Sequence, residues 1–196
     1  MWQALDMQLD GADGPDLGQL QALALTNYGH FTSMLVEFGQ VRGLSLHLER
    51  LSRDCATLFN VELDLDHVRK CIRHALDPST DRTVVRVTVF DPDIDLGTMG
   101  RDANPRVLVS ARSASSAEPA PLRLSACAYQ RDIPATKHVA CSGQCRRGAR
   151  LSAMVSMTSC SSITLATSRR LPPPTSGSSE TAASCGRGRP CWRASR

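Results

Sequence analysis

The sequence predicts an α+β fold of mixed α/β character, in which strands flank an inserted pair of helices. Three segments carry this prediction: a hairpin pattern over residues 31–44, two amphipathic helical patterns over residues 45–76, and a β-branched run over residues 83–90. The sequence contains no internal repeat. Its 196 residues are enough for one ordinary domain, or for a small domain and part of another.

The first predicted elements are a hairpin and a helix. Phe31 to Phe38 has the pattern of a strand, Gly39-Gln40 suits a tight two-residue turn, and Val41 to Leu44 would return antiparallel. Ser45 is a candidate N-cap for a helix whose apolar residues recur at the helical spacings of three and four. These apolar residues are Leu48, Leu51, Cys55, Leu58 and Phe59.

A second helix is predicted to begin at Asp64 or Asp66, either of which could cap it, and to end at Asp77-Pro78. Its inward residues are Val68, Cys71, Ile72, Ala75 and Leu76. The segment that follows, Thr83 to Phe90, is β-branched on both faces and suits a strand that is covered on both sides. Arg86 interrupts its apolar character and would need a partner there.

Further strands are predicted for Arg106 to Ala111 and for Leu122 to Tyr129. Residues 113–121, between them, are mostly small residues and prolines, which is typical of an exposed linker. We therefore expect five parts in the chain. They are an N-terminal extension over 1–22, a small α/β domain over 23–112, the linker over 113–121, the start of a larger domain over 122–140, and a tail over 141–196.

Charge and cysteine are unevenly distributed along the chain. The net charge is +4, yet residues 141–196 hold nine arginines, no lysine and one acid, so this tail carries +8 and residues 1–140 carry −4. The tail also holds five of the 8 cysteines and lacks periodic apolar residues, so we expect it to be mostly disordered. No apolar run is long enough to cross a bilayer, and the acidic N-terminus does not suit an export signal, which predicts a cytoplasmic protein.

Three motifs occur in an order that resembles the class IV aminotransferases, the fold-type IV pyridoxal-phosphate enzymes. They are N-Y-G-H-F-T-S-M (residues 27–34), L-S-L-H-L-E-R-L (residues 44–51) and Y-Q-R-D-I-P-A-T-K-H-V (residues 129–139). The family includes branched-chain and D-amino-acid aminotransferases and aminodeoxychorismate lyase. The resemblance covers residues 23–139 and implies the small domain of that fold with the first strands of its large domain.

The resemblance implies that Lys137 forms the Schiff base with pyridoxal 5'-phosphate. A lysine amine can hold the aldehyde as an imine, exchange it for a substrate amine and then move the proton. The alternative is an ordinary solvated lysine, but the chain has only one other lysine, Lys70, and Lys137 lies inside the motif. The resemblance also implies amino acid and 2-oxo acid substrates and a homodimer. No metal site is expected.

The other candidate site residues follow from the same resemblance. Arg50 occupies the position of the arginine that binds the cofactor phosphate, and His47 lies three residues earlier on the same helix face; both could instead be surface charges. Tyr28 and Arg86 are candidates for the substrate carboxylate, although Tyr28 could be a core aromatic residue and Arg86 a paired strand arginine. Arg131 is expected to steady the lysine strand unless it is simply exposed.

The tail lacks the motifs with which the family continues, G-[FY]-D-D-x-L-F and S-E-G-x-x-S-N-[IL]. Reverse translation explains this. Met157-Thr158 forces a stop codon in one alternative frame, whereas the other frame permits both motifs, with a Gly and an Asp forced by the codons of Met154 and Met157. We infer that one base has been lost near Ala140, and that the tail is an out-of-frame reading of the same gene.

The sequence therefore predicts a pyridoxal-phosphate-dependent aminotransferase, or alternatively a lyase of the aminodeoxychorismate type. The printed chain lacks the acid and the S-N-[IL] segment that the family places around the cofactor, so we expect it to be inactive. A second alternative is a non-catalytic module whose basic tail binds nucleic acid. That tail has Trp192 as its one aromatic residue, which gives little support to nucleic-acid binding. Its cysteines lack the C-x2-C spacing of a structural zinc site, so a zinc-binding tail is not favoured either.

Overall fold

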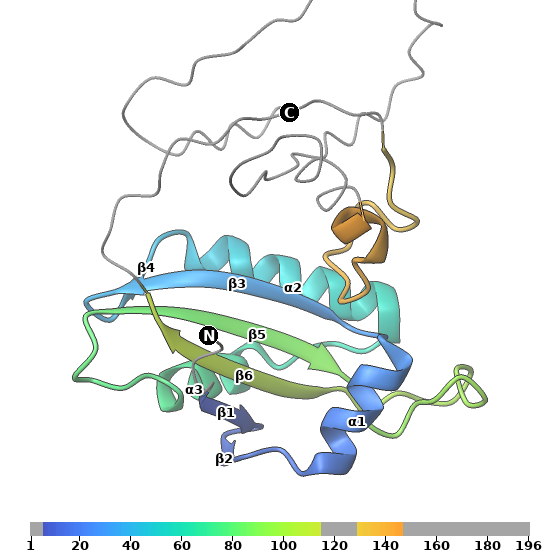
Figure 1. Cartoon of the computed structure of the whole chain (residues 1–196), viewed down its shortest axis with the longest axis horizontal. Coiled ribbons are helices and arrows are strands. Elements are labelled where there is room, and N and C mark those ends of the chain that lie inside the picture. The colour runs from blue at the N-terminus through green and yellow to red at the C-terminus, as the bar shows by residue number, and fades with distance from the viewer. Residues whose placement is uncertain (1–5, 115–128, 147–196) are drawn as a thin grey trace, which may run out of the picture. The chain divides into compact units, whose positions relative to one another are not determined.

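The computed structural model describes residues 6–114 and 129–146. Within them, six strands form one antiparallel sheet in the order β2-β1-β6-β5-β3-β4 (Figure 1). The strands are β1 (Asp6–Leu9), β2 (Ala12–Asp13), β3 (His30–Glu37), β4 (Gln40–Val41), β5 (Arg82–Phe90) and β6 (Arg106–Ser113). The helices are α1 (Leu17–Thr26), α2 (Leu44–Phe59) and α3 (Leu65–His74). The predicted mixed α and β fold is confirmed.

The predicted hairpin is present as β3 and β4, with its turn one residue earlier than expected. Glu37 pairs with Gln40, so the two-residue loop is Phe38-Gly39 rather than Gly39-Gln40. Both loop residues have positive φ, 49° and 72°, the backbone that the type I′ hairpin turn requires. The returning strand is only two residues long, because the chain enters α2 at Leu44.

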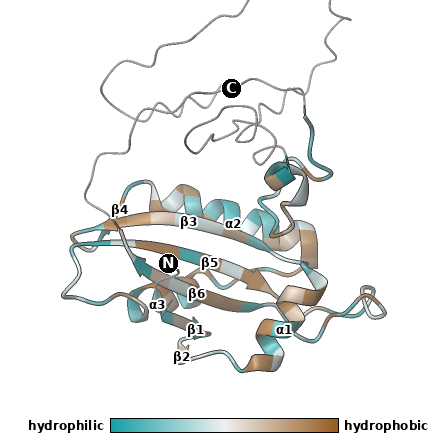
Figure 2. Cartoon of the chain, viewed as in Figure 1, coloured by the Kyte–Doolittle hydropathy of each residue, from teal (hydrophilic) through white to brown (hydrophobic). Residues whose placement is uncertain are grey.

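Both predicted helices are confirmed, and they cover the same face of the sheet. α2 begins one residue before the predicted cap Ser45, after Gly43 in left-handed conformation, and Asp64 caps α3 by accepting bonds from two backbone amides. Apolar residues of both helices are buried against inward residues of the three central strands. The buried group includes Leu48, Leu51, Cys55, Phe59, Val68, Cys71, Ile72, Met34, Val36, Val85, Val87, Val107 and Val109. In Figure 2 the central strands carry brown stretches, while the visible side of α2 is largely teal.

β5 lies between β3 and β6 and is covered unequally on its two faces. Its inward valines are buried, but on the opposite face Thr88 and Phe90 are buried while Val84 and Arg86 are only half-buried. Cover on both sides is therefore limited to the C-terminal half of the strand. There α1 packs over Phe90 through its own apolar residues. The N-terminal half of β5 on this opposite face, around Arg86, contributes to the site described below.

Residues 6–26 form structure that the sequence patterns do not predict. β1 pairs with β6, and α1 begins with a capping box in which the Asp16 carboxylate and the Gln19 side chain bind each other's backbone amides. Asp10, in the turn after β1, pairs with Arg106 and accepts a bond from the Val107 amide at 2.8 Å. β1 and the turn after it are held by these distant partners in β6, which local periodicity does not reveal.

The remaining sequence predictions fall partly outside the described residues. The strand predicted for 106–111 is confirmed and continues to Ser113, into the predicted linker. The rest of that linker lies largely outside the description, as do residues 122–128 and 147–196. Residues 142–146 form a short helical turn where no structure was expected. No helix in the described ranges has the length and apolar character needed to span a membrane.

Gly29, just before β3, supplies a first test of the fold. Its φ is +150°, and a Cβ added there would lie 2.6 Å from the Val89 carbonyl oxygen. We expect Gly29→Ala to lower the free energy of unfolding by about 3 kcal/mol, measured by urea denaturation. Gly39→Ala is the matched control: its φ is also positive but no atom lies within 4 Å, so about 1 kcal/mol is expected. Equal losses in the two variants would contradict the close approach at Gly29.

Candidate functional site

The segment that carries Lys137 lies along the edge of β3 near its start. The Phe31 amide donates to the Lys137 carbonyl at 2.9 Å, and the Val139 amide donates to the Gly29 carbonyl at 2.9 Å. His30 and His138 form an antiparallel bridge between these bonds. The segment thus extends the sheet on the side of β3 that is away from β5, and it brings residue 137 beside residues about 100 positions earlier in the chain.

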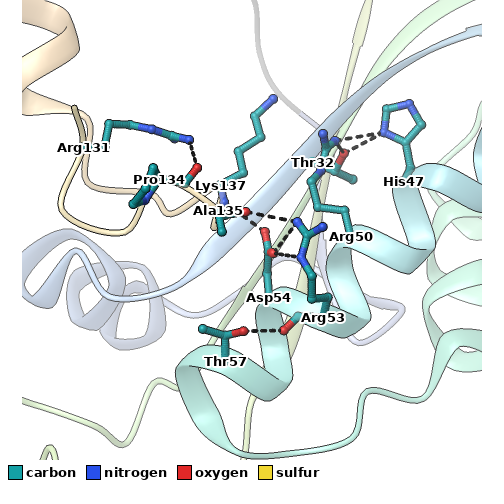
Figure 3. A network of polar contacts seen from close by, with 10 residues as sticks. All are labelled: Thr32, His47, Arg50, Arg53, Asp54, Thr57, Arg131, Pro134, Ala135 and Lys137. Atoms are coloured by element: carbon teal, nitrogen blue, oxygen red, sulfur yellow. Dashed lines mark hydrogen bonds and ion pairs between the residues drawn. The ribbon is translucent and has the colours of Figure 1, made fainter. Parts of the chain in front are cut away.

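α2 brings a second group of polar side chains to this place. The Arg50 guanidinium donates to the Thr32 hydroxyl, which lies 2.7 Å from Nδ1 of His47 (Figure 3). Arg50 also lies 3.2 Å from the same nitrogen. Because a guanidinium only donates, these contacts require Nδ1 of His47 to accept, which places the ring proton on Nε2 and leaves the imidazole neutral. Burial lowers the pKa of His47, and the charge of Arg50 lowers it further.

Positive charges converge on the Lys137 amine. Burial lowers the pKa of this amine, and the charges of Arg50, Arg86 and Arg131 lower the same pKa further. The Lys137 Nζ lies 4.9 Å from the centroid of the Phe31 ring, and the Arg86 guanidinium lies 3.7 Å from that centroid. A lower pKa increases the share of neutral, nucleophilic amine near neutral pH. The surrounding guanidinium groups favour an anion.

Arg86 has the partners that its place in a strand requires. Its guanidinium stacks on Phe31, and its Nε donates to the Thr88 hydroxyl at 3.3 Å. Burial lowers the pKa of Arg86. Both contacts are on the sheet face that α2 does not cover, so Arg86 and Arg50 approach the lysine segment from different sides of β3. Its role toward a substrate carboxylate stays a prediction.

The other two sequence candidates are placed differently. Arg131 donates to the Pro134 carbonyl at 2.6 Å and so closes the loop that leads into Lys137 (Figure 3). Tyr28 donates its hydroxyl to the Leu58 carbonyl at 2.6 Å and packs edge-on against Phe59. Within the described ranges, the polar and ring contacts of Tyr28 are made with Leu58 and Phe59 and not with the guanidinium groups around Lys137.

Sequence reasoning missed three residues that shape the site: Thr32, Arg53 and Asp54. Asp54 is 1% exposed and accepts the Lys137 backbone amide at 2.9 Å, and Arg53 binds both Asp54 and the Ala135 carbonyl. A signal was present for Asp54. It lies on the apolar stripe of α2 between Leu51 and Cys55, and a carboxylate at a core position requires a charged or hydrogen-bonded partner. Thr32 carries no such signal, because threonine is common in strands.

His30 is a further buried group near the lysine segment. The side chain is fully buried, and neither ring nitrogen has a hydrogen-bond partner among the described residues. Burial lowers the pKa of His30 to about 4, although the charge of Asp54 acts in the opposite direction. The ring is therefore neutral in the folded protein at neutral pH.

The described part of the chain offers no metal centre, since no group of three or more His, Cys, Asp or Glu side chains there could hold an ion. What it offers is an amine of lowered pKa among guanidinium groups, with one buried nitrogen of Arg50, Nε, still without a partner among the described residues. This arrangement suits a small molecule that has both an anionic group and an electrophilic carbon.

Comparisons with known proteins agree with the motifs. Residues 29–147 match the protein family described as Amino-transferase class IV. No curated protein matches the chain significantly.

Several solved structures share the fold. A 4-amino-4-deoxychorismate lyase from Pseudomonas aeruginosa is 24% identical with a TM-score of 0.57, over 73% of this chain and 56% of that one. An aminotransferase from Brucella abortus, bound to PLP, is 19% identical with a TM-score of 0.60, over 78% and 60%. A fold IV transaminase from Curtobacterium pusillum is 16% identical with a TM-score of 0.57, over 82% and 64%. The chain thus spans less than two thirds of the length of each.

The buried His30 predicts a pH-dependent stability. Because its pKa is lowered from 6.5 to about 4 in the folded state, the unfolded chain binds the proton first as pH falls. We expect this contribution to be full above pH 6.5 and to decline by about 3 kcal/mol by pH 4.

Urea denaturation of a His30→Leu variant, at steps from pH 7 to pH 4, checks this expectation. The variant should lose less stability than the unchanged chain over that range, while His74→Gln on the exposed end of α3 should follow the unchanged chain. Parallel curves for all three proteins would show that His30 does not titrate as stated.

Proposed function

Because this chain belongs to the class IV aminotransferase family, we propose that it is part of an enzyme that uses pyridoxal 5'-phosphate to transfer an amino group from an amino acid to a 2-oxo acid. The observation that carries the proposal is the position of the Lys137 amine. It lies among three guanidinium groups, and burial and these charges lower its pKa.

The described residues fit two ends of this cofactor. The Lys137 amine would bond to the aldehyde carbon, and a neutral amine is the form that can do so. Arg50 would bind the phosphate: its Nε is buried without a partner in the described ranges, and a planar guanidinium binds phosphate oxygens in pairs. His47, kept neutral by its contacts with Thr32 and Arg50, fixes the orientation of that guanidinium.

Catalysis divides between the cofactor and these side chains. When bound, the cofactor supplies a conjugated ring that takes up the electron pair of the substrate Cα–H bond. In our proposal Lys137 Nζ accepts the Cα proton and returns it, and the surrounding positive charges keep this amine from holding the proton too strongly. Arg86 would bind the substrate carboxylate on the open face of the sheet, while Arg131 steadies the loop before Lys137. A role for Tyr28 toward the same carboxylate stays part of the proposal.

The site needs groups beyond those described. We propose that the intact gene product supplies an acid opposite the pyridine nitrogen and an S-N-[IL] segment from the frame that the sequence permits after residue 140, and that it forms a homodimer. The printed chain would then lack these groups, and it would neither retain the cofactor nor convert substrate. Aminotransferases and aminodeoxychorismate lyases share the fold, so the product, an amino acid or pyruvate, distinguishes the two reactions.

Reduction with borohydride tests where the cofactor binds. We expect a protein with the single base restored near codon 140 to take up pyridoxal phosphate and to retain one phosphopyridoxyl group on Lys137 after reduction, detected by peptide mass spectrometry. Lys70→Ala should be labelled normally and Lys137→Ala should not.

Three results would count against this proposal. Equal labelling of Lys70 and Lys137 in the restored protein would refute the assignment of the site, and stable stoichiometric labelling of the printed chain would refute its predicted inactivity. Salt-sensitive binding of nucleic acid through the tail, without cofactor uptake by the restored protein, would favour the non-catalytic alternative.

The affinity for the cofactor tests Arg50. In the restored protein, Arg50→Ala should weaken pyridoxal phosphate binding by about tenfold to a hundredfold, since a charge-assisted hydrogen bond contributes about 1.5–3 kcal/mol. Titration of the absorbance of the bound cofactor measures this change. Arg42→Ala removes the same charge from an exposed position just before α2 and should change the affinity little. Similar losses in both variants would indicate a general charge effect and no specific phosphate contact.

A further inference from the structure

Lys137 is held through both of its backbone polar groups. Its carbonyl accepts the Phe31 amide of β3, and its amide donates to the Asp54 carboxylate of α2 at 2.9 Å. The two partners belong to different elements, so together they fix both the position of this residue and its rotation about the strand axis. Figure 3 shows the consequence: the Lys137 side chain extends away from Asp54, with the amine at its far end.

Asp54 also orients Arg53, which makes a second hydrogen bond to the lysine segment. Its Oδ1 accepts two bonds from the Arg53 guanidinium, at 2.9 and 3.2 Å, and that guanidinium donates to the Ala135 carbonyl at 3.1 Å. Asp54 is 1% exposed, whereas the Arg53 side chain is 56% exposed. The hydrogen bond from the Lys137 amide to Asp54 is therefore shielded from water. The hydrogen bond from Arg53 to the Ala135 carbonyl lies at the surface, where screening weakens it.

The same helix carries the residue that faces the amine. Asp54 follows Arg50 by one helical turn, and side chains four residues apart on a helix lie on one face. α2 thus sets the distance between the guanidinium of Arg50 and the backbone of the lysine segment. A rigid helix holds this spacing more precisely than a loop would.

We propose that Asp54 is a positioning residue for Lys137: it binds the backbone amide of Lys137 and so keeps the amine among the guanidinium groups. Arg53 supports this position through its hydrogen bond to the Ala135 carbonyl. The inference deepens the proposed function, because it concerns the lysine that would take the cofactor. The contacts themselves involve only residues of this chain, so the inference can be tested without the cofactor.

The direction in which the pKa of Lys137 shifts in an Asp54→Asn variant separates a positioning role from a direct charge effect. The charged groups that face the amine are Arg50 from α2, Arg86 from β5 and Arg131 from the loop before Lys137, and the neutral but titratable His47 of α2 lies beside Arg50. If Asp54→Asn releases the segment, the amine moves toward water and away from these charges, and the pKa of Lys137 rises. Loss of the Asp54 charge alone would instead lower that pKa, because a nearby anion favours the protonated amine.

Competitive labelling of the printed chain with a trace of acetic anhydride, from pH 6 to 11, measures this shift. Peptide mass spectrometry gives the acetylation of Lys137 relative to Lys70, the exposed lysine of α3 that serves as an internal reference. We expect Asp54→Asn to reduce this ratio by about tenfold near pH 8, which corresponds to a rise of about one pKa unit. Glu49→Gln is the matched control: it removes the same charge from an exposed position of α2 and should leave the ratio unchanged.

Arg53→Ala provides the second variant, because it keeps the buried Asp54 carboxylate and removes the hydrogen bond to the Ala135 carbonyl at the surface. We expect it to fold and to reduce the ratio by about threefold, in line with the weaker contact. A folded Asp54→Asn with an unchanged or increased ratio would overturn the proposal. If Asp54→Asn does not fold by circular dichroism, Arg53→Ala decides, and an unchanged ratio in that variant overturns it. Failure of the restored protein to take up pyridoxal phosphate would refute the proposed function but leave these results standing.

Discussion

The packing of α2 against the sheet is the constraint on which the rest of the structure depends. The apolar stripe of this helix, which includes Leu48, Leu51 and Phe59, is buried against the inward residues of the central strands. Burial of side chains of this size contributes about 1.5–3 kcal/mol each. Once this stripe is seated, the rotation of the helix is fixed. Arg50 and Asp54 must then face the edge of β3, where the lysine segment lies.

This arrangement places charges where they are costly. The Lys137 amine lies close to several guanidinium groups, and the buried carboxylate that holds this segment, Asp54, is engaged by the lysine backbone amide and by Arg53. Like charges held together in a partly buried place destabilise the folded chain, and their pKa values fall in response. Such uncompensated charge is characteristic of a site shaped for an anion, because a bound anion relieves the repulsion.

How much of this could be predicted from the sequence depended on how local the signal was. The hairpin and both helices on the core face carry their own periodicity, and Asp64 is a local cap, so these elements were predicted within one to four residues at their ends. β1 and α1 were not, since β1 is short and α1 has no buried residue. Lys137, Arg50 and His47 were named as candidates through motifs, and their roles stay predictions. Asp54 was not, because its partner lies 83 positions away in the chain and only the fold brings the two together.

The place where the lysine segment is held bears on the inferred change of reading frame. The contacts that fix residues 135–139 within the described ranges come from Gly29, Phe31, Arg53 and Asp54, all of which precede the inferred loss of a base near Ala140. A shift at that point would therefore leave the geometry of Lys137 and Arg50 intact. It would remove only those groups that complete the cofactor site from later in the chain. The two halves of the site are separable in this fold, since one depends on α2 and β3 and the other on residues beyond the lysine segment.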